Sequence, residues 1–139
     1  MQIHKLTEQL SVAAQIAPED IAELATAGFR SLINNRPDGE ADDQPASALL
    51  AAAAASHGLD YRYLPVVSGQ VSEQNAVDFS VALRSLPAPV LAFCRTGTRC
   101  CTLWALQAAG DADAVLDTAR QAGYDLQSLR PRLSPRSGR

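Results

Sequence analysis

The sequence predicts an α/β domain in which a mostly parallel sheet of four to five strands is flanked by helices. Segments with strand character alternate with helical segments along most of the chain, an order typical of a sheet covered by helices. Residues 90–93 (VLAF) are all apolar, as expected for a central strand that is buried on both faces. With 139 residues, of which 47% are hydrophobic, the chain suffices for one domain with a buried core.

The expected elements follow one another with clear boundary signals. Helix starts and stops are marked by Pro18, Gly28, Gly58 and Gly110, and a turn is marked by the segment 35–39. We expect strands at 10–13, 29–34, 60–67 and 90–93, and helices at 18–28, 45–57, 72–86, 101–110, 113–121 and 127–130. Residues 1–130 are thus predicted to form a single catalytic domain, and the arginine-rich residues 131–139 a flexible tail.

Composition excludes several classes of function. The formal net charge of -3 gives no basic face for nucleic acid or an anionic membrane. No apolar run reaches the roughly 18 residues of a membrane span, and the first residues lack the order of a secretory signal. The three cysteines lie within eight residues and cannot form disulfides that link distant segments, so we expect free thiols in the cytoplasm. No metal site and no cofactor are expected.

The segment from Cys94 to Arg99 (CRTGTR) carries the chemistry. It joins a buried strand to a helix, whose free N–H groups and dipole stabilise negative charge. Gly97 allows the backbone to approach an anion closely, and two guanidinium groups add positive charge. These features are expected to lower the Cys94 pKa below about 8.5. The predicted catalytic residues are Cys94 and Arg99, and the predicted anion-binding residues are Arg95, Thr96, Gly97, Thr98, Arg99 and Cys100.

The cysteines also have a simpler interpretation. Cys94 would then be a small buried core residue with surface arginines nearby, since free cysteine is often buried and inert. For Cys100 and Cys101, packing beneath the loop is favoured over a role in which one of them is a resolving thiol for Cys94. Both interpretations remain open at the level of the sequence.

The loop resembles the active-site loops of two enzyme families. Protein tyrosine and dual-specificity phosphatases carry a cysteine, five further residues and an arginine; Gly97 matches their glycine, but Cys100 stands where their arginine would be and Phe93 replaces their histidine. Rhodaneses use a six-residue loop that often reads Cys-Arg-x-Gly-x-Arg. The loop is similar to this second form at Cys94, Arg95, Gly97 and Arg99. The shorter loop favours a sulfur ligand over a phosphoester.

Other segments resemble the phosphatase-like domain family named after beta-lactamase-hydrolase-like proteins. The similar segments are residues 27–40 (AGFRSLINNRPDGE), 63–66 (YLPV) and the helix with VDFSVAL, and the resemblance covers roughly residues 3–110. It implies the fold of protein tyrosine and dual-specificity phosphatases with a rhodanese-like loop. Members are often fused to, or encoded beside, a persulfide dioxygenase in bacterial sulfide oxidation.

The resemblance implies a cysteine-dependent sulfurtransferase that acts in sulfide oxidation or detoxification. Cys94 would take the outer sulfur of thiosulfate or glutathione persulfide, become a persulfide, and pass the sulfur to a thiol or cyanide. Arg95 and Arg99 would hold this anionic donor, and the N–H groups of residues 96–100 would hold the persulfide. A persulfide dioxygenase is the expected protein partner.

Two alternatives stay open beside the sulfurtransferase. A phosphatase acting through a Cys94 phosphocysteine would need a general acid, usually an aspartate on a neighbouring loop. The expected loop, residues 65–74, contains no aspartate; its only acid is Glu73, and the other acids considered are Asp38, Glu40, Asp60 and Asp78. The second alternative is a non-catalytic sensor that binds a persulfide or an anion through the same loop.

Overall fold

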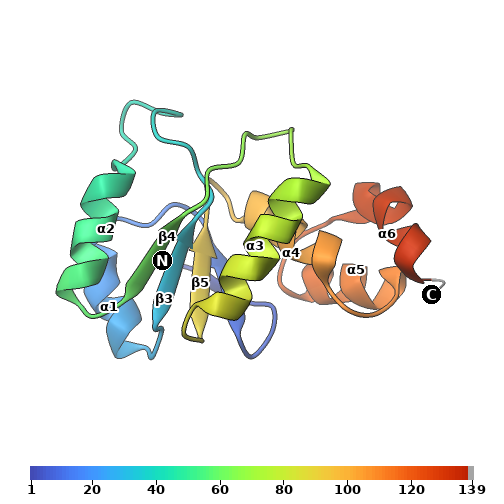
Figure 1. Cartoon of the computed structure of the whole chain (residues 1–139), viewed down its shortest axis with the longest axis horizontal. Helices are drawn as coiled ribbons and strands as arrows, with labels where there is room; N and C mark the ends of the chain where they lie inside the picture. Colours follow the sequence, from blue (N-terminus) through green and yellow to red (C-terminus); the bar gives the residue numbers. More distant parts are fainter. Residues whose placement is uncertain (138–139) are drawn as a thin grey trace.

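The computed structural model describes the backbone of residues 1–137 and the side chains of residues 1–133. Its sheet lies between two groups of helices (Figure 1). The strands are β1 (Ile3–Lys5), β2 (Leu10–Ala13), β3 (Ser31–Asn34), β4 (Asp60–Tyr63) and β5 (Val90–Phe93). The helices are α1 (Ile21–Thr26), α2 (Ser47–Ser56), α3 (Glu73–Ser85), α4 (Thr98–Gln107), α5 (Ala112–Gln121) and α6 (Arg130–Ser137), with 3-10 turns at Pro18–Asp20 and Gln127–Leu129.

The sheet has five strands in the order β1-β2-β5-β3-β4. β5 lies in the middle and pairs in parallel with both β2 and β3, while β4 extends the parallel part beyond β3. Only β1 among the described strands runs antiparallel, along the outer side of β2. The predicted fold class is therefore confirmed. β1 was not predicted, because a three-residue, largely exposed edge strand leaves little hydrophobic pattern.

Each face of the sheet is covered by its own core. On β5, Leu91 and Phe93 pack with α1 and α2, whereas Val90 and Ala92 pack with α3, α4 and α5. Side chains alternate between the two faces of a strand, so an all-apolar strand serves both layers at once. Figure 1 shows α1 and α2 on one side of the sheet and the later helices on the other.

The carboxyl ends of the parallel strands meet at one edge of the sheet. Ala13, Phe93, Asn34 and Tyr63 end their strands in register with one another. The segments that follow these strands therefore emerge side by side, although they are far apart in sequence. In parallel α/β sheets this edge is where ligands bind.

The structure differs from the sequence prediction in several segments. The predicted flexible tail begins inside α6: residues 130–137 are helical and Leu133 is fully buried, while residues 138–139 lie outside the described part of the chain. β4 is four residues long instead of the predicted eight, because the chain turns toward α3 near Pro65. In the described residues, no helix combines the length and the apolar content needed to cross a membrane.

Candidate active site

The loop after β5 brings Cys94 to the carboxyl edge of the sheet. Cys94 N–H donates to Ala13 O at 3.4 Å, and the N–H of Gln15 donates to Arg95 O at 3.4 Å. These two bonds continue the pairing of β5 with β2 and hold the start of the loop. Helix α4 then begins at Thr98, earlier than predicted, so the last two predicted loop residues belong to its first turn.

The sulfur of Cys94 is surrounded by hydrogen-bond donors. Gly97 N–H donates to Sγ at 3.1 Å. The pKa of the Cys94 thiol is lowered to about 6, first by a hydrogen bond from the Cys100 thiol and also by backbone N–H groups, although burial acts in the opposite direction. Those N–H groups belong to Cys100, Thr96 and Gly97. At neutral pH the side chain is thus mostly thiolate, which is the nucleophilic form of cysteine.

Gly97 is required by two independent features of the loop. Its φ of 92° lies in the left-handed region, which is costly for residues with a side chain. A Cβ at this position would also overlap the hydroxyl of Tyr124. That hydroxyl donates to Thr96 O at 3.2 Å, and burial raises the pKa of Tyr124 to about 12, so it remains a donor. Tyr124 therefore packs over the loop and holds it from outside.

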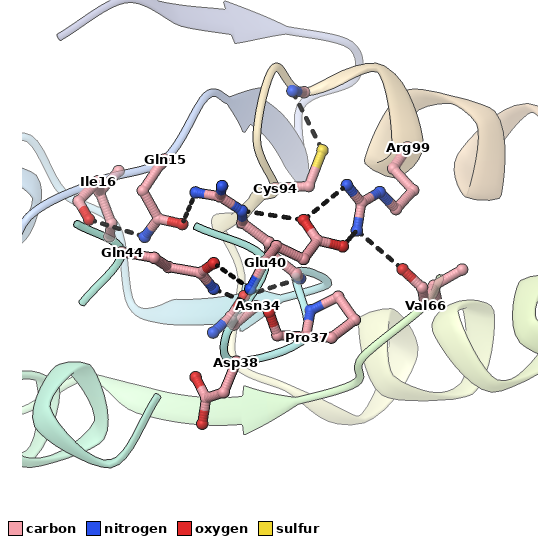
Figure 2. Close-up of polar contacts among 12 residues, drawn as sticks. Gln15, Ile16, Asn34, Pro37, Asp38, Glu40, Gln44, Val66, Cys94 and Arg99 are labelled. Atoms are coloured by element: carbon pink, nitrogen blue, oxygen red, sulfur yellow. Dashed lines mark hydrogen bonds and ion pairs between the residues drawn. The ribbon is translucent and has the colours of Figure 1, made fainter. Parts of the chain in front are cut away.

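Arg99 is tied to a carboxylate from the opposite segment of the chain. Its Nη1 lies 2.8 Å from Glu40 Oε2, its Nη2 lies 3.2 Å from Glu40 Oε1, and its Nη1 also donates to Val66 O at 2.8 Å (Figure 2). Arg36 Nε donates to Glu40 Oε1 at 3.0 Å from the other side. The hydrogen bond from Arg99 is the largest cause that holds the pKa of Glu40 below its usual range. Glu40 is therefore an anion held between two guanidinium groups.

This pairing fixes the orientation of Arg99 without using all of its donors. A guanidinium has five N–H groups. The contacts with Glu40 and Val66 use three of them, and the Nε–H and the second Nη2–H have no partner among the described residues. Since Arg99 is 8% exposed and lines the pocket described next, the free donors can serve an anion in that pocket.

A pocket of about 490 Å³ opens beside the loop. Three arginines line it: Arg95, Arg99 and Arg132. Hydroxyl side chains from three parts of the chain also line it, namely Ser68, Thr96, Thr98, Thr102 and Ser128. Cys94 itself is 1% exposed and does not line this pocket, whereas its neighbours Arg95 and Thr96 do.

The acids that the sequence offered as proton donors are mostly engaged elsewhere. Glu40 is ionised between its two arginines, and Asp38 Oδ1 accepts the N–H of Ser47 at 2.8 Å at the start of α2. Asp60 begins β4 and therefore lies at the opposite edge of the sheet from Cys94. Asp78 accepts a hydrogen bond from Gln74 on the surface of α3. Glu73 is exposed and pairs with Arg132, which lines the pocket.

The two neighbouring cysteines have different surroundings. Both are fully buried in the first turn of α4. The Cys100 thiol contacts the Cys94 sulfur, and burial raises the pKa of Cys100 well above its usual range, so it stays protonated and donates. Burial also raises the pKa of Cys101 to about 12. Cys100 thus faces Cys94, and Cys101 packs into the core.

The structure brings the predicted loop residues together but adds partners that the sequence did not reveal. Thr96 and Thr98 are exposed and joined by a 3.1 Å hydrogen bond between their hydroxyls, and Arg95 is exposed at the pocket. Sequence reasoning missed Gln15 and Arg36, which extend the network around Glu40, and it missed Tyr124. The sequence offered a signal for Arg36, which lies in the turn after β3. That turn leaves the sheet at the same edge as the Cys94 loop, so its polar side chains were candidates for the site.

Comparisons with known proteins give a consistent family and fold. A model of the phosphatase-like domain of beta-lactamase hydrolase-like protein matches residues 2–111. A beta-lactamase hydrolase-like protein of Agrobacterium fabrum is 34% identical over 130 residues, covering 91% of this chain and 30% of that protein. A crystal structure of a candidate phosphatase from Neisseria meningitidis has a TM-score of 0.86 and 32% identity, covering 97% of this chain and 98% of that one. The active form of Tk-PTP has a TM-score of 0.71 and 13% identity, covering 99% and 97%, which supports the fold alone.

The prediction of a sulfurtransferase is wrong. The matching family is phosphatase-like and the similar solved structures are those of phosphatases, so the phosphatase alternative fits better. The error has a physical reason: a thiolate within a ring of N–H groups serves sulfur transfer and phosphoryl transfer equally well. Loop length and a missing aspartate could not separate the two. The sulfur donors and the dioxygenase partner remain untested predictions.

The share of each protein that the match covers shows how this chain relates to the family. The chain spans about 30% of the length of the curated relative from Agrobacterium fabrum. The family model covers most of the described residues, including the whole of the Cys94 loop and the Glu40 turn. The chain therefore belongs to the family of phosphatase-like domains of beta-lactamase hydrolase-like proteins, a family with the fold of cysteine-dependent phosphatases.

Proposed function

We propose that this domain hydrolyses phosphate monoesters through a covalent phosphocysteine on Cys94. The observation that carries the proposal is the Cys94 thiolate, with a pKa lowered to about 6 chiefly by the Cys100 thiol and within reach of N–H groups at the start of α4. A low-pKa thiolate beside donors for a tetrahedral oxyanion is the arrangement needed for attack on phosphorus.

The reaction has two displacements. In the first, the Cys94 sulfur forms a bond to phosphorus while the bond from phosphorus to the ester oxygen breaks, and the leaving oxygen takes the electron pair. In the second, water attacks the phosphocysteine, the bond from phosphorus to sulfur breaks, and phosphate and thiolate are released. We propose that the N–H groups of residues 96, 97 and 100, which surround the Cys94 sulfur, and the free donors of Arg99 hold the phosphoryl oxygens during both steps.

The preferred leaving group follows from the acids around the site. Glu40 cannot give a proton at neutral pH, because its pKa is held below the usual range chiefly by Arg99. Glu73 is exposed and paired with Arg132. A phosphatase without a buried acid works best on esters whose leaving oxygen needs no proton, such as aryl phosphates. We therefore expect activity on 4-nitrophenyl phosphate to exceed activity on alkyl phosphates by at least about a hundredfold.

The test is a leaving-group series with wild type and Cys94→Ser. We expect kcat to fall steeply as the leaving group becomes more basic, and Cys94→Ser to lose activity on every ester. Rapid acid quenching followed by mass spectrometry should find one phosphoryl group on the peptide that contains Cys94. Cys101→Ser is the matched control, since it changes a buried sulfur that is not among the causes of the lowered Cys94 pKa. Full activity of Cys94→Ser would refute the proposal.

A further inference from the structure

We infer that the pocket beside the loop recognises a second anionic group on the substrate, and that Arg132 of α6 is the residue that binds this group. This inference rests on the proposed function and narrows its substrate class. The substrate would be a small phosphate monoester that also carries another phosphate or a carboxylate, with the reacting phosphate at Cys94 and the second group at the far wall of the pocket.

The size of the pocket exceeds what one phosphate requires. Its volume is about 490 Å³. A phosphate group has five heavy atoms and would fill a small part of it. The walls come from the Cys94 loop, from the segment containing Ser68 and Val71, and from the turn that leads into α6. The site therefore has room for the rest of a substrate.

The charges on the pocket wall favour an anion at two separate places. Arg95 lies in the Cys94 loop and Arg99 in the first turn of α4, whereas Arg132 lies on α6. Among the described residues, no aspartate or glutamate lines the pocket, and the Arg95 guanidinium has no partner. Arg99 is largely neutralised by Glu40. Arg132, whose exposed ion pair with Glu73 is weak, thus supplies positive charge from α6 that a phosphate at Cys94 alone would leave unused.

Arg132 is held loosely enough to bind a ligand. Its Nη2 donates to Val71 O at 3.1 Å and to Glu73 Oε1 at 3.2 Å. The side chains of Arg132 and Glu73 are 38% and 62% exposed, and an ion pair this exposed is weak. Its Nη1 and Nε donors have no partner in the described part of the chain. A guanidinium with free donors at a pocket wall suits the forked recognition of phosphate or carboxylate.

Binding measurements on a non-catalytic protein test this assignment separately from catalysis. Inorganic phosphate and tripolyphosphate would be titrated into Cys94→Ser by calorimetry, since only tripolyphosphate offers a second anionic group. We expect tripolyphosphate to bind more tightly than phosphate, and Arg132→Gln in the same background to weaken tripolyphosphate about tenfold while leaving phosphate nearly unchanged. Arg120→Gln is the matched control, because it removes an exposed, ion-paired arginine on α5.

Glu73→Gln separates recognition from a purely structural role. If Arg132 binds the ligand, removing the carboxylate that competes for it should keep or strengthen tripolyphosphate binding. If Arg132 only holds the segment of Val71 and Glu73, to which it donates, then Arg132→Gln should weaken the binding of phosphate and of tripolyphosphate alike, which would overturn the inference. Equal binding of tripolyphosphate by the parent protein and by Arg132→Gln would overturn it too. If tripolyphosphate binds to the parent and variant proteins as expected but the wild type hydrolyses no ester, the binding site is supported and only the proposed reaction is rejected.

Discussion

Replacing Cys100 by alanine should make Cys94 a weaker acid. The Cys100 thiol is the largest single cause of the lowered Cys94 pKa, and it remains protonated because burial raises its own pKa. A hydrogen bond to a charged group contributes roughly 1.5 kcal/mol, and one pKa unit corresponds to about 1.4 kcal/mol. Loss of the thiol should therefore raise the pKa of Cys94 from about 6 to about 7.

The expected change is a shift of the acid limb of reactivity. At about pH 6 the thiolate fraction would fall from about one half to about one tenth, so alkylation of Cys94 by iodoacetamide should slow roughly fivefold. At about pH 9 the variant should react as fast as wild type or faster, because a more basic thiolate is a better nucleophile. The rate of alkylation across pH, followed by mass spectrometry of the Cys94 peptide, gives the pKa directly.

Cys101→Ala is the matched control for this measurement. It also removes one fully buried sulfur from the first turn of α4, and each variant should lose about 1 kcal/mol of stability from the cavity. Cys101 gives no hydrogen bond to Cys94, and its pKa is raised to about 12 by burial. If Cys100→Ala and Cys101→Ala show the same Cys94 pKa, then the thiol contact does not stabilise the thiolate and the reasoning fails.

Two further predictions concern the supports of the loop. Gly97→Ala should lower the free energy of unfolding by about 3 kcal/mol, because it adds strain at a φ of 92° and overlaps the hydroxyl of Tyr124; urea denaturation would measure this, and Tyr124→Phe in the same protein should restore part of the loss. Glu40→Gln should cost about 2 kcal/mol at neutral pH, because it leaves Arg36 and Arg99 without their shared anion. Since the folded pKa of Glu40 lies below its usual 4.5, this stability is present above about pH 4.5 and is lost as the pH falls through the folded value. The gap between wild type and Glu40→Gln should therefore close in acid, and a gap that is constant with pH would contradict the ion-pair explanation.

The sequence by itself determined the fold class and indicated Cys94 as the candidate nucleophile. The strand 90–93 is apolar at every position and is followed at once by a cysteine, a glycine and two arginines, and this local order predicts a central strand that delivers a thiolate to the start of a helix. These signals can be recognised in the sequence because they depend only on residues that are neighbours along the chain. The same local signals could not distinguish sulfur transfer from phosphoryl transfer, because both reactions use a cysteine thiolate beside hydrogen-bond donors that bind an anion.

Tertiary structure decided what surrounds Cys94. Glu40 and Arg99 are 59 residues apart and meet only because β3 and β5 are neighbours whose carboxyl ends lie at one edge. Tyr124 reaches the loop from beyond α5, and the residues after 130 fold into a helix that brings Arg132 to the pocket. These contacts depend on which strands pair and how helices pack, and they cannot be deduced from the spacing of residues along the chain. The orientation of Arg99 and the size of the pocket are therefore properties of the assembled sheet.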